Sequence, residues 1–485
     1  MGIVLKQSFR NIIITYAGFG IGAVNALFLY TYFLTKPYYG VVSYVLSAAN
    51  LIWPVLAFGV HNTLVKFYAG YQDRDQKDRF LTYMLLLPLG ISFFCGFFGV
   101  FLYDKLLTYF NEGDAFVRPY VWTIFVIAFA MTYFEVFYAW VKVELKSVFG
   151  NFMKEIFHRV GATFLLVLVY FNLIEKTTFI YGLTVVYSLR MLFMAGYALQ
   201  TRKPVIRLSL PSNWIPIAKY SILILLAGSV AVILLDLDKV MIKHYLPVGE
   251  VAVYGIMVYI ASVIAVPSRA MHQITYPLTA QLLHQKDTTT LAKLYHQSSI
   301  NLLIISGLVF LLIICNVEQL YQLIPPEYEL VLGIIILLGA IKLYDSILGN
   351  NNSILFNSDY YRMVLLFGVV LALVAFILNI LFIPQFGIMG AALATFLAIF
   401  LYNTVKLIFV YKKFKMHPFT YKTGWSLVVI GLFSGLFLGW SFMYHPLLNI
   451  VLKSVLLGIS YTLIIYRLRL STEINEVINS LWTKK

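Results

Sequence analysis

The reactive side chains of this sequence are ionisable and polar groups that interrupt long apolar stretches. Such groups are costly in lipid, so they usually face a cavity, a ligand or a partner of opposite charge. Six of them are candidate binding residues: Arg190, Arg269, Lys342, Glu135, Asp345 and Asn25. The sequence contains no phosphate-cradling glycine loop, no Cys/His metal spacing and no nucleophile elbow. We therefore expect these residues to bind rather than catalyse, and we expect no enzyme activity, metal or cofactor.

Arg190 is the most informative of the six. It lies near the middle of the apolar stretch over residues 179–199, from where its guanidinium does not easily reach a lipid headgroup. It therefore needs a carboxylate, a water-filled cavity or an anionic ligand. Glu135, in the stretch over residues 120–141, is the candidate carboxylate. A buried Arg190–Glu135 ion pair and a role of both residues in a cavity are left open.

The other candidates each have a structural alternative. Lys342 and Asp345 are three residues apart on one face of a predicted helix, which favours an intrahelical ion pair over contact with a ligand. Arg269 lies at the predicted cytoplasmic end of a helix, where its side chain can extend to the membrane interface. Asn25 follows several glycines of the first apolar stretch, and such residues either allow close helix packing or line a polar lumen.

Fourteen apolar stretches, each long enough to cross a bilayer as a helix, position these residues. A hydrocarbon core about 30 Å thick requires about 20 helical residues, and a helix satisfies its own backbone in lipid. The composition agrees, because 61% of the residues are hydrophobic and only 12% are charged. The sequence therefore predicts an all-α polytopic membrane protein. The predicted helices cover residues 11–34, 39–60, 79–103, 120–141, 157–174, 179–199, 217–235, 251–271, 299–316, 330–349, 363–383, 388–411, 424–443 and 447–466.

The N- and C-termini are predicted to lie in the cytoplasm, because Lys and Arg concentrate in alternate connectors. Lys154 and Arg159 are among these cytoplasmic connector cations. Such cations hold the topology and face anionic membrane lipid. They account for the net charge of +15 without a nucleic-acid partner.

An internal repeat divides the chain. The run Tyr39-Gly40-Val41-Val42-Ser43-Tyr44 returns as Tyr254-Gly255-Ile256-Met257-Val258-Tyr259. Chance similarity of apolar sequence is the alternative explanation. Six helices in each half make this a parallel repeat, related by an axis along the membrane normal. The predicted domains are therefore residues 1–200, residues 201–415 and a remainder, residues 416–485, with two additional helices.

Two further stretches resemble the polysaccharide-biosynthesis branch of the multidrug/oligosaccharidyl-lipid/polysaccharide (MOP) exporter superfamily. One runs over residues 235–242 (LDLDKVMI) and the other over residues 383–395 (IPQFGIMGAALAT). In the second stretch, proline and glycine predict a tight outer turn, and the small residues after it permit close helix contact. In the first, Asp236 and Asp238 are expected to be solvated charges at the outer end of a helix.

The resemblance implies two six-helix bundles around a central cavity, with two extra C-terminal helices beside a groove for a lipid tail. It implies a flippase for O-antigen, capsule or exopolysaccharide precursors of the bacterial cytoplasmic (inner) membrane. Such a flippase moves undecaprenyl-diphosphate-linked oligosaccharide across the membrane by alternating access. Arg190, and less directly Arg269 and Lys342, would bind the diphosphate. A monomer suffices for one cavity, and the implied partners are a polymerase and other polysaccharide-assembly proteins.

Two other functions are weighed against the flippase. An ion-coupled multidrug antiporter of the same superfamily would favour carboxylates deep in the first bundle. The first, second, fifth and sixth predicted helices contain no Asp or Glu, although Glu135 in the fourth keeps this alternative open. A glycan polymerase or ligase usually needs a large outer loop, and the predicted outer connectors are all short.

Overall fold

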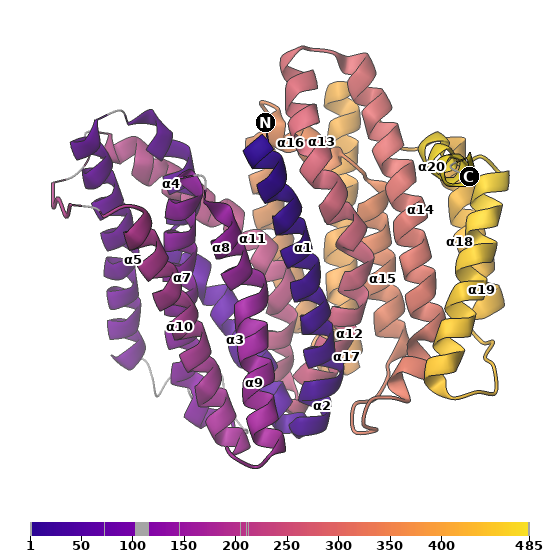
Figure 1. The fold of residues 1–485 in the computed structure, drawn as a ribbon, viewed down its shortest axis with the longest axis horizontal. Helices are drawn as coiled ribbons and strands as arrows, with labels where there is room; N and C mark the ends of the chain where they lie inside the picture. Colours follow the sequence, from indigo (N-terminus) through magenta and orange to yellow (C-terminus); the bar gives the residue numbers. More distant parts are fainter. Residues whose placement is uncertain are drawn as a thin grey trace. The chain divides into compact units, whose positions relative to one another are not determined.

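The computed structural model describes residues 2–71, 73–101, 116–144, 146–203, 205–209, 211 and 213–483, and its regular elements are helices (Figure 1). The chain divides into two compact units, Met1–Gly255 and Ile256–Lys485. The first unit contains α1 (Gly2–Val24), α2 (Tyr30–Phe33), α3 (Lys36–Ala57), α4 (Val60–Phe67), α5 (Arg74–Phe101), α7 (Val121–Val143), α8 (Ser147–Phe152), α9 (His158–Tyr170), α10 (Lys176–Thr201), α11 (Trp214–Tyr245) and the start of α12 (Gly249–Ser262). The second contains the rest of α12, α13 (Val266–His284), α14 (Thr288–Tyr321), α15 (Leu332–Ile347), α16 (Asn351–Asn357), α17 (Tyr361–Phe414), α18 (Tyr421–Phe437), α19 (Pro446–Arg467) and α20 (Thr472–Thr483).

The greater part of each of the fourteen predicted spans falls on helix in the structure. Some predicted ends run too far, such as residues 171–174 and 438–443, which lie in turns after α9 and α18, and residues 102 and 103 of the third span lie outside the described part. Among the described residues, nine helices are long and apolar enough to cross a membrane, or ten if the bent pair α15 and α16 is one span. This count is lower than fourteen partly because α17 contains two predicted spans. Some other predicted spans are divided by a π-helical turn or a bend into helices too short to be counted. The protein is therefore an all-α, multi-pass membrane protein with about 14 membrane helices.

The join within α17 is the tight turn that the sequence predicts at residues 383–387. Gly387 has φ 60° and ψ −140°, outside the helical region, so the helix direction changes there. A Cβ atom on Gly390 would lie 2.1 Å from the carbonyl oxygen of Phe382. Only glycine permits this close approach of the two segments.

Two π-helical turns interrupt the helices of the first unit. One covers Asn25–Leu29, between α1 and α2, and the other covers Met153–Phe157, between α8 and α9. A π-helical turn inserts an extra residue into a helix and is frequent at functional sites. Each of these turns carries polar residues of the site described below.

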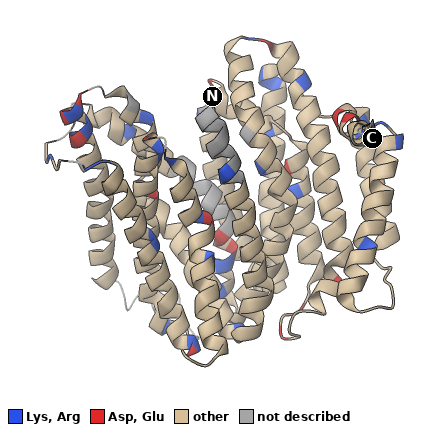
Figure 2. Ribbon diagram, in the orientation of Figure 1, with Lys and Arg blue, Asp and Glu red and all other residues tan. Residues whose placement is uncertain are grey.

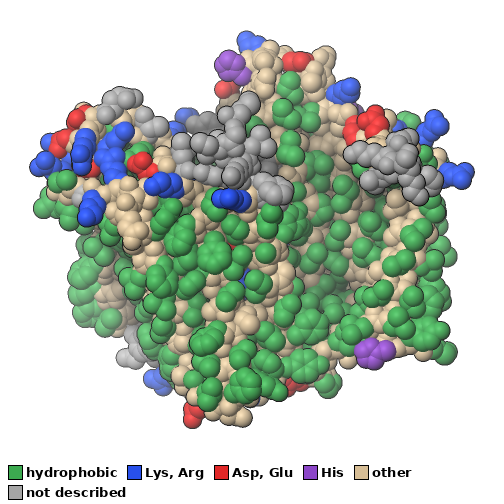
Figure 3. Space-filling view, viewed as in Figure 1, with side chains coloured by type: hydrophobic (Ala, Val, Ile, Leu, Met, Phe, Trp, Pro, Cys, Tyr) green, Lys and Arg blue, Asp and Glu red, His purple; other side chains and the backbone are tan. Residues whose placement is uncertain are grey.

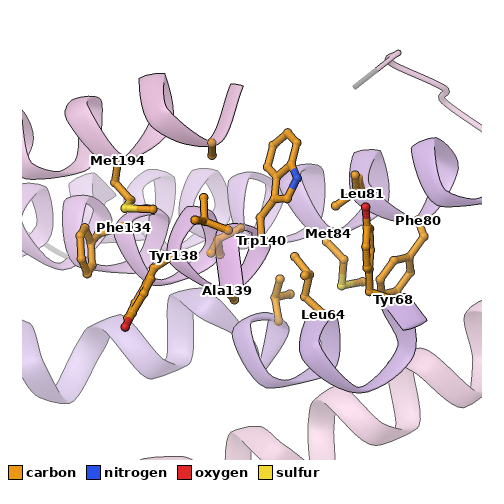
Figure 4. Close-up of a cluster of buried hydrophobic side chains, with 14 of the residues drawn as sticks. Leu64, Tyr68, Phe80, Leu81, Met84, Phe134, Tyr138, Ala139, Trp140 and Met194 are labelled. Carbon is orange, nitrogen blue, oxygen red and sulfur yellow. The ribbon is translucent and has the colours of Figure 1, made fainter. Parts of the chain in front are cut away.

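The core of the first unit is an aromatic and aliphatic cluster shared by α4, α5, α7 and α10 (Figure 4). Trp140 and Phe134 of α7 are fully buried in it, as is Met194 of α10. In lipid the hydrophobic effect does not drive helices together, so close van der Waals packing of this kind holds them in place. It fixes α10 against α7, and therefore fixes the site residues that these helices carry.

The sides of the helices present hydrophobic side chains to the surroundings (Figure 3). On α5 the exposed set includes Phe93, Phe97 and Phe101, which are 50–71% exposed. Figure 2 shows that many charged residues lie near helix ends, with few between them. This distribution is typical of a membrane protein, in which the sides of the helices contact lipid and their ends contact water.

Candidate functional site

Arg190 is buried within the first unit, with 6% of its surface exposed. Its guanidinium carbon lies 4.0 Å from the ring centre of Phe134 on α7 and 5.2 Å from that of Tyr187, one turn away on α10. Its Nε atom has no hydrogen-bond partner among the residues described, and no described carboxylate oxygen lies within 4.0 Å of the guanidinium. Aromatic faces attract the cation but do not neutralise it, so Arg190 retains unused capacity for an anion.

Glu135 does not pair with Arg190. Its Oε1 atom accepts a hydrogen bond from Nζ of Lys154 at 2.6 Å, which makes an ion pair between α7 and the π-helical turn at Met153–Phe157. The sequence predicts the Lys154 ammonium to lie in a cytoplasmic connector. In the structure it is part of a helical segment, because α8, the π-helical turn and α9 run on without a gap.

A second ion pair stands beside the first. Nη1 of Arg159, on α9, lies 3.3 Å from Oε2 of Glu155 and donates to the Glu155 carbonyl oxygen at 2.8 Å. The charges of Lys154, Arg159 and Arg190 all act on the ring of His158, whose Nδ1 atom is buried without a partner among the described residues.

We call Lys154, Arg159 and Arg190, with Glu135 and Glu155, the cation cluster. Glu135, Glu155 and Arg159 all act electrostatically on Arg190, so the five groups share one region. Three positive side chains face two negative ones, and Lys142 of α7 also acts electrostatically on Glu135, so positive charge is in excess in this region. A region with this sign, enclosed by apolar helices, favours an anionic ligand.

Asn25 lies at the edge of the cation cluster and is satisfied there. Its Nδ2 donates to the carbonyl oxygen of Arg159 at 2.9 Å, and its Oδ1 accepts from Oγ1 of Thr163 at 2.7 Å. Of the two interpretations of this residue, these contacts favour helix packing over lining a lumen. Asn25 joins the first π-helical turn to α9.

The three remaining candidates lie in the second unit. Lys342 and Asp345 do not form the expected ion pair, since no contact within 4.0 Å joins them among the described residues; Oδ1 of Asp345 accepts instead from Nδ2 of Asn403 at 3.2 Å. The charges of Asp345 and Arg269 act on Lys342. Arg269 itself is exposed. These groups form a second polar region, separate from the cation cluster in sequence and in structural unit.

Two buried lysines of the second unit are not among the candidates from the sequence. Lys406 of α17 is 1% exposed, and its Nζ donates to Oδ1 of Asn352 at 2.8 Å and lies 4.1 Å from the ring centre of Tyr402. Lys453 of α19 donates to the carbonyl oxygen of Cys315 on α14. Both stand inside predicted apolar helices, so the signal that marks Arg190 is present for them too.

Asp236 and Asp238 correct another expectation, because both are buried rather than solvated. Asp236 accepts hydrogen bonds from Oγ of Ser47 at 2.7 Å, from Nδ2 of Asn50 at 3.1 Å and from Nζ of Lys239 at 3.2 Å. Asp238 accepts from the Tyr254 hydroxyl at 2.6 Å. The reason is that α11 continues to Tyr245, so these aspartates lie more than a turn inside the helix.

The two turns paired by the sequence repeat contact one another. Nζ of Lys36 lies 2.8 Å from Oε1 of Glu250, and a Cβ atom on Gly40 would lie 2.0 Å from the carbonyl oxygen of Val248. A cavity of about 780 Å³ opens beside this contact, lined by Lys36, Tyr38 and the segment up to Glu250. The ion pair and the hydrogen bonds of Asp236 together hold α3 against α11 and the start of α12.

Comparison with solved structures identifies the fold. The chain is similar to a lipid II flippase, MurJ, in an inward closed conformation, with a TM-score of 0.72 and 13% identity over 94% of this chain and 98% of that one. It is also similar to an inward-facing multidrug resistance MATE family transporter of the MOP superfamily, with a TM-score of 0.59 and 14% identity over 88% and 95% of the two chains. A point mutant of the MATE transporter VcmN of Vibrio cholerae gives a TM-score of 0.55 and 11% identity over 85% and 96%.

No protein-family model matches the chain, and no curated protein matches it significantly by sequence. At these low identities the structural similarity establishes the fold alone. The chain therefore has the fold of MOP-superfamily transporters, in agreement with the architecture expected from its sequence.

Proposed function

We propose that this protein is a flippase that moves undecaprenyl-diphosphate-linked oligosaccharide across the bacterial cytoplasmic membrane by alternating access. The observation that carries the proposal is the buried guanidinium of Arg190, which has no carboxylate within 4.0 Å among the described residues. An arginine in that position stabilises a phosphate with two parallel hydrogen bonds. The excess positive charge of the cation cluster supports the same ligand.

The lipid tail would remain beside the protein. A groove of about 440 Å³ lies in the second unit between α13, α14, α19 and α20, and most of its lining is apolar. Ile305 of α14, Ile465 of α19 and Val477 of α20 are among its lining residues. A prenyl chain would lie along these apolar side chains, away from Asn301, Thr462 and Glu473, which also line the groove. The polar head alone would then need the interior of the protein.

We further propose that the chain divides into residues 1–200, 201–415 and 416–485, and that both termini lie in the cytoplasm. The protein would act as a monomer, with polysaccharide-assembly proteins as partners. Arg269, Lys342 and Asp345 would contact the head or its sugars from the second half of the chain. Arg190 and Glu135 would act from the first half, and Asn25 would support them by fixing the neighbouring helix.

A multidrug antiporter is the second candidate, because MATE transporters share the fold. Glu135 is the carboxylate that such a mechanism would use, but in this structure Lys154 neutralises it at 2.6 Å. A cationic drug would therefore meet a region of its own charge. Proton- or sodium-dependent efflux of cationic dyes from cells that overproduce the protein would favour the antiporter.

The experiment that tests the flippase compares Arg190→Ala with wild type in proteoliposomes that contain lipid-linked oligosaccharide. The amount of lipid-linked oligosaccharide that reaches the opposite leaflet is measured with a lectin that binds its sugars and cannot cross the membrane. Loss of hydrogen bonds to a charged group is expected to slow transport by about tenfold or more. Arg467→Ala is the matched control, because Arg467 is exposed at the end of α19. Wild-type transport by Arg190→Ala, at equal protein amount, would refute the assigned role.

A further inference from the structure

Lys154 and Glu135 form an ion pair in which the lysine side chain is much more exposed than the carboxylate, and so has more room to move. The Lys154 side chain is 42% exposed, whereas that of Glu135 is only 10% exposed. Glu135 is fixed on α7, in the segment that also carries the buried Phe134. The lysine has a flexible four-carbon stem and a single point charge, so it can turn away while the carboxylate stays.

The backbone beneath Lys154 is held in place, so only the side chain would move. A Cβ atom on Gly18 of α1 would lie 2.5 Å from the carbonyl oxygen of Glu155, which shows how tightly α1 packs on the π-helical turn. The neighbouring cation is fixed as well, because Arg159 is bound to both the carboxylate and the carbonyl of Glu155 on its own helical segment. Lys154 is therefore the movable cation of the cluster.

The partner that Lys154 would turn toward is the ligand of Arg190. The guanidinium carbon of Arg190 lies 4.0 Å from the ring centre of Phe134, the residue before Glu135, and 5.2 Å from that of Tyr187. The ring of Tyr187 lies 5.7 Å from that of His158, which is four residues after Lys154 on the same continuous helical segment, so an anion bound at Arg190 lies in the region of the Lys154–Glu135 pair. A phosphate oxygen and a carboxylate oxygen accept the same kind of charge-assisted hydrogen bond from an ammonium group. Glu135 thus occupies, in this structure, the position next to Lys154 that a ligand oxygen would need.

We propose that Glu135 is a positioning residue that holds Lys154 in a resting position and yields it to a phosphate group bound at Arg190. The inference rests on the proposed function, since it assumes a phosphate-bearing ligand. Competition between Glu135 and phosphate lowers the affinity of the resting site. It also promotes release of the ligand, because Lys154 returns to Glu135 when the phosphate leaves.

Binding of inorganic pyrophosphate to the purified full-length protein in nanodiscs tests this exchange. Glu135→Gln keeps the size of the side chain and removes its charge, so Lys154 becomes available and pyrophosphate should bind about tenfold more tightly. Lys154→Gln should weaken binding, and adding Glu135→Gln to Lys154→Gln should then produce no tightening. Glu175→Gln, which alters an exposed carboxylate bonded to Thr177, is the matched control and should bind as wild type.

The outcomes separate the two proposals. If the wild-type protein binds no pyrophosphate, phosphate recognition and the proposed function fail together. If wild type binds pyrophosphate but Glu135→Gln binds it equally or more weakly, only the exchange is refuted. The same holds if Glu135→Gln still tightens binding when it is combined with Lys154→Gln. Damage to the fold does not tighten binding, so the expected result cannot arise from a merely structural role. Should Glu135→Gln fold poorly, Glu135→Asp shortens the same carboxylate, and unchanged pyrophosphate affinity in that variant would also refute the exchange.

Discussion

At the scale of single residues, the described buried charges include some that are bonded across helices and some that have mainly aromatic and neutral contacts. Asp236 belongs to the first kind, because three donors from α3 and α11 reach its carboxylate. Arg190 belongs to the second, with Phe134 and Tyr187 around it. In lipid, a paired charge stabilises a contact between helices, and an unpaired one marks a place for a ligand.

Asp236→Ala should destabilise the protein, because it would leave the hydroxyl of Ser47, the amide of Asn50 and the ammonium of Lys239 without their shared acceptor. Removal of one partner from such a buried network costs on the order of 2 kcal/mol in free energy of unfolding. The midpoint of thermal unfolding in detergent would measure the loss. Asp359→Ala, at an exposed aspartate before α17, is the control that should unfold as wild type. Equal midpoints for both variants would show that the hydrogen bonds of Asp236 contribute nothing.

At the scale of elements, the helices are defined as much by their interruptions as by their length. The π-helical turn at Met153–Phe157 places Lys154 toward Glu135, and the turn at Gly387 lets one long helix serve as two spans. The first interruption has no signature in the sequence, which is why the sequence places Lys154 in a connector. The second has one, because proline and glycine stand together before a run of small residues.

Gly390→Ala should sharply reduce the amount of folded protein. The added methyl group would stand 2.1 Å from the carbonyl oxygen of Phe382, and backbone on both sides must shift to relieve the overlap. Gly431→Ala in α18 is the matched control, since nothing lies within 4 Å of its added methyl group. Fluorescence-detected size-exclusion chromatography of the two variants compares their yields. Similar yields would mean that the turn tolerates a side chain.

At the scale of the whole molecule, the arrangement of helices follows from hydropathy, whereas the fine structure of the site does not. The fourteen apolar stretches predict the helices that the structure contains, because length and composition alone decide what can span lipid. Arg190 is also predictable, as a charge in the middle of a span. Its lack of a carboxylate partner is not, since the choice of Glu135 between Arg190 and Lys154 depends on helix rotation that composition does not encode. The prediction for Asp236 is wrong for a related reason, because polar residues suggest a helix end that lies further on, at Tyr245.

The predicted topology can be measured by labelling single cysteines in intact cells, in a background that carries both Cys95→Ser and Cys315→Ser. Met443→Cys, in the exposed connector between α18 and α19, should react with a maleimide that cannot cross membranes. Glu476→Cys, on α20, should react only after the cells are permeabilised, because the C-terminus is expected in the cytoplasm. The reverse pattern would invert the orientation assigned to every connector.

The aromatic face of α5 has a consequence for how this protein must be made. Among the described residues, Phe93, Phe97 and Phe101 are 50–71% exposed, and their rings lie against one another along the helix. A chain with such a surface would precipitate if it were released from the ribosome into water. Its synthesis must therefore be coupled to a translocon, and each helix must move laterally into the lipid bilayer as it leaves the ribosome.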